Sequence, residues 1–444
     1  MSIWRNNHTI ICVTPLLCIE YKNYYVSFKI CREIDEHPLH CAIFGESHDA
    51  VAETATFFWS LKQQGAKTSR LIVRSRHNNI DLTTFHVKRL TQILDANPGR
   101  TIEILKGTWN AEQSEVLATR PYPLKLRLSR EFTFQDEGTS FVDALQRRQT
   151  SFGWLNIVYG DKGRPFNHAN WSRFLRLDVT FEKLTIGCLE GENVLLPFSM
   201  KVKALVYELA ADDIQLEEFE SLAIAAKDLT IEMQITVLQH DENWNRRPIV
   251  FLERIAELGH FENFGFVAKS RRNSSTYHGY ISRAKVAELA EAFCRVIRGN
   301  PNLTQLTLDD HHRDFQWYLH LENIFQALED HPNLRTFTIG LMMWSGFDFS
   351  PLEKLLSRKR DIIVLNFSGE IILNGGSIDR LYALNRFIKG SAKLVSEETV
   401  LRPLLAATAL INGALPEFQY ISILLSDHTD FVCEHINSVN LEPL

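Results

Sequence analysis

Acidic residues and histidines gather in one short segment, LDDHHRDF, which begins at Leu308. Histidine and carboxylate groups together are ligands for zinc or iron. Adjacent residues do not converge easily on one ion, and no second ligand set follows at a fixed offset, so a polar turn at the end of a strand explains the segment without a metal. We therefore predict no metal site. The residues concerned are Asp309, Asp310, His311, His312, Asp314 and His320.

A metal-dependent enzyme using the Asp310–His312 cluster stays open as an alternative hypothesis. It predicts metal bound in stoichiometric amount, and loss of that metal when His311 and His312 are replaced by Ala.

The segment FGESHDA, from Phe44, has the order of a nucleophile elbow, with a serine between a strand and a helix. The elbow needs G-x-S-x-G for its sharp turn, and here Asp49 stands where the second glycine belongs. Ser47 or Asp49 is better explained as the cap of the following helix. His40 and Cys41 are neighbours on a strand, so their side chains point to opposite faces. We predict no catalytic residue, and a chain that is not an enzyme.

Other polar segments also lack a chemical signature. The glycine pair in LNGGSID, around Gly375, matches neither phosphate-binding motif. His428 lies on the apolar face of a predicted helix and is expected to be a hydrogen-bonded core residue. The cysteines show no C-x-x-C spacing, which argues against a zinc ribbon or redox motif and suits a reducing compartment. They are Cys12, Cys18, Cys31, Cys41, Cys188, Cys294 and Cys433. We therefore expect no cofactor.

The structural elements are most clearly visible in a phrase that occurs twice. Residues 300–310 read NPNLTQLTLDD and residues 331–341 read HPNLRTFTIGL, so the copies begin 31 residues apart. Each ends in an alternation of period two, which predicts a strand with one apolar face. The matched apolar residues are Leu303, Leu306 and Leu308 in the first copy and Leu334, Phe337 and Ile339 in the second.

The residues between the copies have the period of a helix. Gly299 supplies a helix stop before the first copy, and Pro301 prevents continuation of that helix. One face holds Leu321, Ile324, Phe325 and Leu328, and an equivalent face before the first copy holds Val286, Leu289, Ala290, Phe293 and Ile297. The predicted unit is a helix, a tight turn and a short strand, repeated at about 30 residues.

Further strands of this kind can be found along the chain at irregular steps of 21 to 42 residues. Their apolar-x-apolar cores are predicted to begin at Ile102, Leu126, Leu155, Leu184, Leu205, Leu229, Phe264, Leu306, Phe337 and Leu365.

With this unit the chain resembles leucine-rich-repeat proteins of the long-repeat, ribonuclease-inhibitor-like type, whose consensus is L-x-x-L-x-L-x-x-N/C-x-L. The resemblance implies an α/β solenoid, with a curved parallel sheet on the concave side and helices on the convex side. The Asn/Cys position holds His311 and Met342, and the final Leu is replaced by Arg313 and Trp344. We therefore expect no asparagine ladder and irregular turns.

Residues from about 80 to the end are also similar to a large group of leucine-rich-repeat-like proteins encoded by diatoms. The phrases that carry this similarity include ANPGRTIEIL, VLATRPYPLKL, GTSFVDALQRRQTSFG, LNRFIKGSAKLV and LRPLLAATALINGA. The similarity implies a fold and no activity.

The two ends differ from the middle, and solenoids need caps over their last repeats. Residues 1–48 alternate as strands in HTIICV, LLCIEY, YYVSFKI and HCAIF, with a hairpin turn at Lys22 and Asn23. A helix is predicted from about Asp49 to Gln64. Residues 49–370 form the predicted solenoid and residues 371–444 a helical C-terminal cap. The cap's apolar faces are Ile378, Leu381, Leu384 and Ile388; Leu401, Leu404 and Leu405; and Ile421, Leu424, Leu425, His428, Val432 and His435.

In the leucine-rich-repeat fold that the chain resembles, side chains between the apolar strand positions point to the concave side. A solvated sheet face would account for them, but repeat proteins use this surface for binding. Trp and Arg are enriched at interface hot spots, which favours Trp154 beside Lys125 and Arg127 as the binding patch. The concave positions are Thr101, Glu103, Lys125, Arg127, Trp154, Asn156, Lys183, Thr185, Gln305, Thr307, Thr336 and Thr338.

Composition narrows the class of partner. The 444 residues carry a formal charge of -6, which gives no general attraction to nucleic acid or anionic lipid. The basic stretches RLIVRSRH, from Arg70, and AKSRRNSS, from Ala268, are interpreted as solvated loops. No stretch approaches the 20 or so apolar residues of a membrane span. The N-terminal TIICVTPLLCIEY is interpreted as strand rather than signal peptide, so we expect a cytoplasmic or nuclear protein.

The sequence therefore predicts a non-catalytic protein–protein interaction module, monomeric, with another protein on its concave face and with no nucleic acid, membrane or cofactor. A substrate-receptor subunit of a ubiquitin ligase is a further alternative, although the N-terminus shows no F-box-like helical run.

Overall fold

The computed structural model describes most of the chain. The described residues are 2–5, 7–13, 24–32, 39–62, 69–74, 81–158, 165–237, 243–271, 281–310, 315–340, 348–395, 402, 418–430 and 433.

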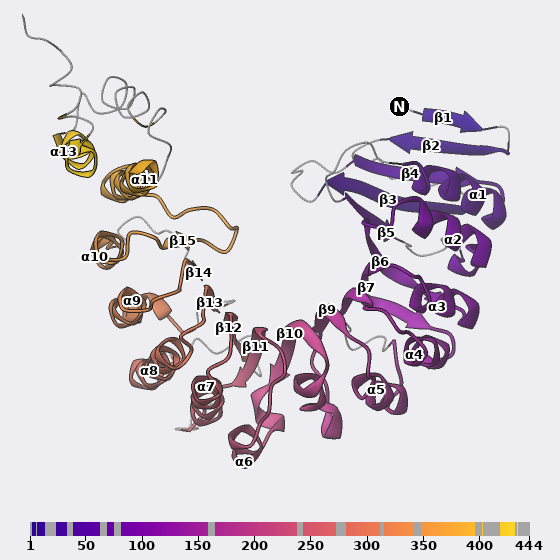
Figure 1. Ribbon diagram of the computed structural model, residues 1–444. Coiled ribbons are helices and arrows are strands. Elements are labelled where there is room, and N and C mark those ends of the chain that lie inside the picture. The colour runs from indigo at the N-terminus through magenta and orange to yellow at the C-terminus, as the bar shows by residue number, and fades with distance from the viewer. Residues whose placement is uncertain are drawn as a thin grey trace, which may run out of the picture.

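The described strands form one open sheet of 15 strands, and helices alternate with the strands over most of the chain. Figure 1 shows the strands side by side along the inner side of an arc and the helices along its outer side. The predicted α/β class is confirmed. The sheet is mostly parallel, because only its N-terminal strands pair antiparallel.

The N-terminal strands run in the order β1-β2-β4-β3-β5. The bounds are β1 (Ser2–Arg5), β2 (Thr9–Val13), β3 (Tyr24–Arg32), β4 (Leu39–Gly45) and β5 (Ser69–Arg74). The strands expected in HTIICV, YYVSFKI and HCAIF are confirmed. The segment LLCIEY and the turn at Lys22 and Asn23 lie outside the described residues. The interpretation of RLIVRSRH as a solvated loop was wrong for residues 70–74, which belong to β5.

From β5 onward each strand pairs in parallel with the next strand along the chain. The bounds are β6 (Thr101–Trp109), β7 (Leu124–Phe134), β8 (Gly153–Ile157), β9 (Phe181–Ile186), β10 (Val202–Ala210), β11 (Asp228–Thr236), β12 (Asn263–Arg271), β13 (Gln305–Asp310), β14 (Thr336–Ile339) and β15 (Ile363–Leu365). The second basic stretch was also misread in part, because Ala268–Arg271 complete β12 and Ala268 is buried.

The helices are α1 (His48–Trp59), α2 (Val87–Ala96), α3 (Ala111–Ala118), α4 (Thr139–Gln146), α5 (His168–Leu175), α6 (Leu216–Glu220), α7 (Arg246–Leu258), α8 (Arg283–Gly299), α9 (Leu321–Glu329), α10 (Ser350–Arg358), α11 (Ser377–Val395) and α13 (Phe418–Asp427). The short step between β9 and β10 holds two 3-10 turns, η2 (Gly191–Asn193) and η3 (Leu196–Ser199). Residues 187–201 are described throughout and contain no α-helix.

Two rows of apolar side chains run along the sheet and form its core face. In each row the residues are paired in register from strand to strand, and none is more than 6% exposed. The first row is Leu71, Ile102, Leu126, Leu155, Leu184, Leu205, Leu229, Phe264, Leu306, Phe337 and Val364. The second row is Val73, Ile104, Leu128, Ile157, Ile186, Tyr207, Ile231, Phe266, Leu308 and Ile339. Nine of the ten predicted strand cores therefore have the expected register.

The tenth strand core was predicted one residue too late. Val364, not Leu365, pairs with Phe337 and is buried. The run from Ile362 to Leu365 is apolar throughout, so its pattern is the same for either choice of face. Leu365 is half-buried on the opposite face.

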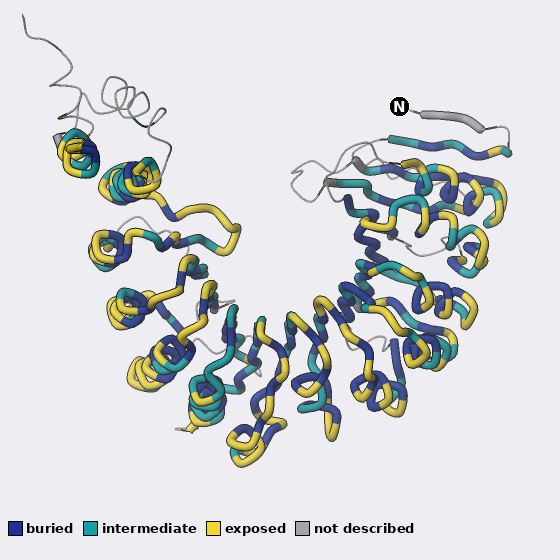
Figure 2. Tube along the Cα trace, viewed as in Figure 1, coloured by how far each residue is buried: buried dark blue, intermediate teal, exposed yellow. Residues whose placement is uncertain are grey.

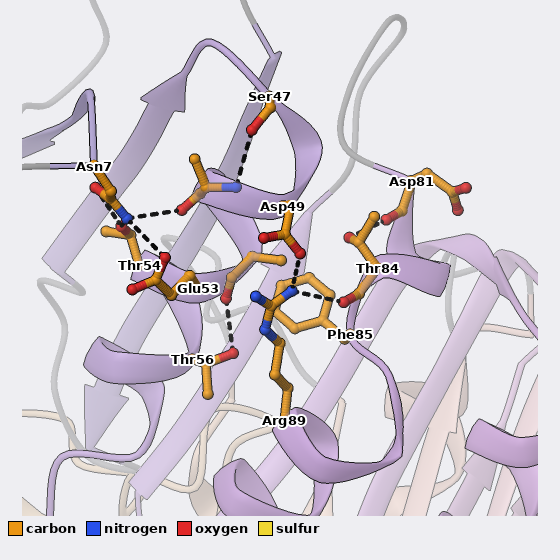
Figure 3. Close-up of polar contacts among 12 residues, drawn as sticks. Asn7, Ser47, Asp49, Glu53, Thr54, Thr56, Asp81, Thr84, Phe85 and Arg89 are labelled. Carbon is orange, nitrogen blue, oxygen red and sulfur yellow. Dashed lines mark hydrogen bonds and ion pairs between the residues drawn. The ribbon is translucent and has the colours of Figure 1, made fainter.

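Polar contacts attach the N-terminal strands to α1 and α1 to α2 (Figure 3). The Ser47 hydroxyl accepts a hydrogen bond from the Ala50 N–H at 3.2 Å, which confirms the predicted helix cap. Asn7 Nδ2 donates to Thr54 Oγ1 at 3.0 Å. Arg89 bridges Asp49, at 2.6 Å, and the carbonyl of Thr84, at 3.2 Å. The first helix ends at Trp59, five residues before the predicted end at Gln64.

The buried face of α11 differs from the prediction. Ile378 is buried as expected, whereas Leu384 and Ile388 are half-buried, and the buried positions include Tyr382 and Asn385. The Tyr382 hydroxyl accepts from the Val364 N–H at 3.0 Å, and Asn385 Nδ2 donates to the Leu356 carbonyl at 2.8 Å. Polar side chains occupy this face because the unpaired backbone groups of β15 and α10 need partners there.

The predicted role of His428 is confirmed. It is 1% exposed, its Nδ1 accepts from Arg402 Nε at 3.0 Å, and its Nε2 lies 3.3 Å from Ser391 Oγ. Since Nδ1 is the acceptor, Nε2 carries the proton and the imidazole is not poised to take one from Ser391. Leu401, Leu404, Leu405, Val432 and His435 lie outside the described residues.

Successive units are joined by what we call the helix-end ladder, a set of polar side chains that donate to carbonyl groups at the end of the preceding helix. Asn300 Nδ2 donates to the Ile255 carbonyl at 3.1 Å. His331 Nε2 donates to the Asn300 carbonyl at 2.9 Å, and Lys359 Nζ donates to the His331 carbonyl. The ladder consists of Arg100, Arg148, Arg254, Asn300, His331, Lys359 and Asn385. It supplies donors to carbonyls at or just beyond the helix ends, where intrahelical partners run out. The Ile255 carbonyl also accepts from the Gly259 N–H at 3.4 Å, and the Asn300 carbonyl from the Leu303 N–H at 3.1 Å.

Burial affects the protonation of the ladder. His331 is 5% exposed, and its Nδ1 accepts from the N–H of Leu334 at 3.0 Å, so the ring is held in its neutral form. Burial lowers the pKa of His331, and the nearby charge of Lys359 acts in the same direction. Burial likewise lowers the pKa of Lys359. The residues expected to replace an asparagine ladder, at positions 311, 313, 342 and 344, lie outside the described residues, so that expectation stays a prediction.

Candidate binding surface on the inner face of the sheet

The predicted concave residues lie on the sheet face opposite the two core rows. They form two polar rows, in register from strand to strand. The first contains Thr101, Lys125, Trp154, Lys183, Gln305 and Thr336, and the second contains Glu103, Arg127, Asn156, Thr185, Thr307 and Thr338. Figure 2 shows that the inner strands are largely buried or half-buried, while the outer surfaces of the helices are exposed.

The structure divides these residues into two groups. Strands β6 to β9 carry one group and strands β13 to β14 carry the other, and three strands lie between them. The intervening strands continue both rows with Ala204, Asp228 and Asn263 in the first and Val206, Thr230 and Gly265 in the second. These positions were not singled out from the sequence, although the same offset from Leu205, Leu229 and Phe264 would have found them.

The N-terminal group is strongly basic. We define the basic patch as Arg70 on β5, Lys125 and Arg127 on β7, Trp154 on β8 and Lys183 on β9. Lys125 is half-buried and Lys183 is exposed, and neither forms an ion pair with any residue that the structure describes. Arg70 was missed because its strand had been interpreted as a loop.

Glu103 is the acidic residue in this part of the two rows, and it is 5% exposed. Its carboxylate pairs with Arg70 and lies 3.7 Å from Arg127 Nε. A carboxylate that is buried and paired in this way contributes little field of its own. The rows from β5 to β9 therefore present four cations against one neutralised carboxylate, a local charge of +3 in a chain whose total is -6.

Trp154 stands between the two lysines of the first row. Its ring centroid lies 5.6 Å from Lys183 Nζ, a cation–π contact. Because Trp154 pairs in register with Lys125 on one side and Lys183 on the other, its ring is flanked by cations across adjacent strands. A planar aromatic surface bordered by fixed cations suits an interface hot spot.

Three polar atoms in the same area have no hydrogen-bond partner among the described residues. They are Thr101 Oγ1, Trp154 Nε1 and Asn156 Oδ1. Thr101 is 2% exposed and Asn156 is 6% exposed, so these groups have little access to bulk water. Leaving a buried donor or acceptor unsatisfied costs about 1–3 kcal/mol per group. These groups lie on β6 and β8, where the inner face does not supply all of its buried polar atoms with hydrogen-bond partners.

The inner face becomes acidic farther along the sheet. Lys269 on β12 donates to Glu208 Oε1 at 3.1 Å and also bonds Glu232, so two carboxylates surround one cation. Burial would lower the pKa of Lys269, but the hydrogen bond and charge of Glu232, helped by Glu208, outweigh it and raise the pKa. The second group, on β13 and β14, is uncharged and consists of Gln305 and three threonines.

The acidic and histidine-rich segment is only partly described. Asp309 is 5% exposed on β13, and residues 311–314 lie outside the described residues. Within the described part of the chain, no group of three or more His, Cys, Asp or Glu side chains is arranged to hold a metal ion. Burial raises the pKa of the Cys41 thiol, and it raises that of Cys294 to about 11.

A depression of about 640 Å³ lies at the ends of α9 and α10 and includes His331, Lys359 and Lys389 in its lining. Two of its four cations are engaged, since Lys359 donates to a helix-end carbonyl and Arg358 pairs with Glu329 at 2.6 Å. Basic side chains at helix C-termini are explained by the exposed carbonyls there, so the helix-end ladder accounts for this feature.

No protein-family model matches the chain, and no curated protein is significantly similar to it. Among the described residues, no helix combines the length and the apolar character needed to cross a bilayer.

Proposed function

We propose that the chain is an irregular leucine-rich-repeat-like solenoid that acts as a non-catalytic protein–protein interaction module. In this proposal residues 1–48 are a β-rich N-terminal cap, residues 49–370 the solenoid and residues 371–444 a helical C-terminal cap. The partner protein docks on the concave face, and the chain works as a monomer in the cytoplasm or nucleus.

The observation that supports the proposal most strongly is the basic patch with its three unpartnered polar atoms. Farther along the inner face some polar groups bond one another, as in the hydrogen bond from Asn263 to Asp228 at 2.6 Å. At β6 to β8 it leaves Thr101, Trp154 and Asn156 without partners. A docked partner that supplies donors and acceptors there would recover that cost, and so binding is favoured at this part of the sheet.

The proposal is tested by quantitative affinity capture from native-cell lysate with the full chain. The variant is Trp154→Ala combined with Lys125→Glu, which changes two members of the basic patch and leaves the Arg127–Glu103 pair intact. Lys88→Glu, on the exposed surface of α2, makes the same lysine-to-glutamate change away from the inner face. Circular dichroism establishes that all three proteins are folded.

We expect one set of bound proteins to be lost from the double variant and kept by Lys88→Glu. If the wild type and the double variant retain the same bound proteins, the inner face is not the binding surface and the proposal is wrong.

A further inference from the structure

We propose that the basic patch binds an extended acidic peptide segment, with two carboxylates three residues apart that reach Lys125 and Lys183 on either side of Trp154. This inference rests on the proposed function, because it names the chemistry of the partner at the same surface. Three observations support it: the charge of the patch, the buried donors and acceptors that have no partner, and the spacing of the strands.

The charge of the patch selects an anionic partner. Lys125 and Lys183 pair with no described carboxylate, and the one acidic side chain of these rows, Glu103, is already engaged by Arg70 and Arg127. Long-range attraction therefore acts on negative charge alone. The neighbouring cluster of Glu208, Glu232 and Lys269 has a net charge of -1 and repels the same segment weakly, which favours β5 through β9.

The unpartnered hydrogen-bonding atoms are buried, and once side-chain movement exposes them they favour a peptide over a simple polyanion. Trp154 Nε1 is a donor and needs an acceptor such as a carboxylate, whereas Asn156 Oδ1 is an acceptor and needs a donor. A phosphodiester backbone offers acceptors only. An extended peptide offers both, because carboxylate and carbonyl oxygens accept while its backbone N–H groups donate. Thr101 Oγ1 can serve either role.

The strand spacing sets the distance between the two carboxylates. Lys125 and Lys183 lie on β7 and β9, with β8 and Trp154 between them. Adjacent strands are about 4.8 Å apart, so the two lysine backbones are separated by about 10 Å. A peptide in the extended polyproline II conformation rises about 3.1 Å per residue with three residues per turn, so side chains three positions apart lie on the same face and about 9 Å from each other. The residues between the carboxylates then lie over the Trp154 ring, where an apolar or aromatic side chain can pack.

The test is a display selection of random dodecapeptides on the full-length chain, followed by fluorescence anisotropy with synthesised hits. We expect enriched peptides to carry two Asp or Glu residues three positions apart. The hits are compared with their amide versions, in which Asn and Gln replace the acids, and with a single-stranded oligodeoxynucleotide of equal charge.

The variants separate the charge argument from folding. Lys125→Glu/Lys183→Glu should weaken the acidic hits at least tenfold, and the matched control Lys88→Glu/Arg283→Glu, whose residues are exposed on α2 and α8, should leave them within twofold. Trp154→Phe keeps an aromatic ring but removes Nε1, and we expect a loss of about fivefold. If Lys125→Glu/Lys183→Glu fails to fold, Lys125→Ala/Lys183→Ala replaces it with the same direction of effect.

The outcomes are distinguishable. Neutral or basic hits that are lost in Trp154→Phe would overturn the acidic inference while leaving peptide binding by the inner face in place. Oligodeoxynucleotide binding tighter than that of the acidic hits would replace the peptide with nucleic acid. If the selection on this chain enriches no peptide relative to a selection on an unrelated control protein, the acidic-peptide inference is overturned. The proposed function is then also overturned for a partner that binds as an extended segment.

Discussion

Asn300 gives the sharpest test of the helix-end ladder. Its side chain is 0% exposed and lies where α7, α8 and β12 meet. Nδ2 donates to the carbonyls of Ile255 at 3.1 Å and Val296 at 2.9 Å, and Oδ1 accepts from the N–H of Phe261 at 3.4 Å. Replacement by Ala removes all three hydrogen bonds and leaves their backbone partners buried.

The expected change in the free energy of unfolding follows from the number of hydrogen bonds that are removed. A typical intramolecular hydrogen bond contributes about 1 kcal/mol net, so Asn300→Ala should lower the free energy of unfolding by about 3 kcal/mol. Asn302 lies two residues further on in the same turn and is exposed, and Asn302→Ala should change the free energy by less than about 0.5 kcal/mol.

Asn300→Asp distinguishes hydrogen bonding from packing. The carboxyl group has nearly the shape of the amide, but it presents an oxygen to two carbonyl oxygens where the amide presents hydrogens. We expect Asn300→Asp to be at least as destabilising as Asn300→Ala.

Urea denaturation followed by circular dichroism measures the three variants, and amide hydrogen exchange of β12 and β13 shows whether a loss is local, since repeat arrays need not unfold in one step. If Asn300→Ala matches Asn302→Ala, or if Asn300→Asp is close to wild type, the hydrogen bonds of the Asn300 side chain do not stabilise the fold.

Two further predictions concern the same turns. Burial lowers the pKa of His331 in the folded chain, whereas a histidine in the unfolded chain has a pKa near 6.5. Below pH 6.5 unfolding therefore takes up a proton at His331. The stability that neutral His331 contributes is present above pH 6.5 and is lost as the pH falls. His331→Asn, with the side chain that Asn300 provides one unit earlier, should flatten the decline of urea midpoints between pH 7 and 5; an unchanged slope would contradict this. A Cβ at Gly299 would lie 2.5 Å from the Ala256 backbone oxygen, so Gly299→Ala should cost about 1–3 kcal/mol. Gly99→Ala, with no atom within 4 Å, should stay within about 0.5 kcal/mol, and equal urea midpoints for both would show the close approach to be unimportant.

The fold was largely predictable because its signal is periodic. Alternation of period two identified both core rows from β6 to β14, and the helical spacing around Phe325 placed α9. Where periodicity is ambiguous the prediction failed, as at Ile362–Leu365, in which every residue is apolar. At β5 the apolar run from Leu71 to Val73 was present, but the flanking charges of Arg70 and Arg74 favoured the loop interpretation.

The candidate surface was predictable in position but not in chemistry. The strand pattern alone indicated which face Trp154 and Lys125 occupy, since alternate residues share a face. The burial and pairing of Glu103 depend on Arg70 in a neighbouring strand, 33 residues earlier, so the local sequence does not contain them. The helix-end ladder was also missed, because its donors are Arg, Asn, His and Lys at unequal spacings and share only the direction in which they reach.

Every donor of the ladder reaches back to a carbonyl that leaves the ribosome before it. His331 is made 31 residues after Asn300, whose carbonyl it binds, and Lys359 is made 28 residues after His331. During synthesis each new helix end therefore stays open to water until the next unit has emerged. The most recently synthesised unit is thus the least stable part of the growing chain. A pause in translation within the array would prolong the exposure of its helix-end carbonyls to water, while the carbonyls of earlier units keep their side-chain hydrogen bonds.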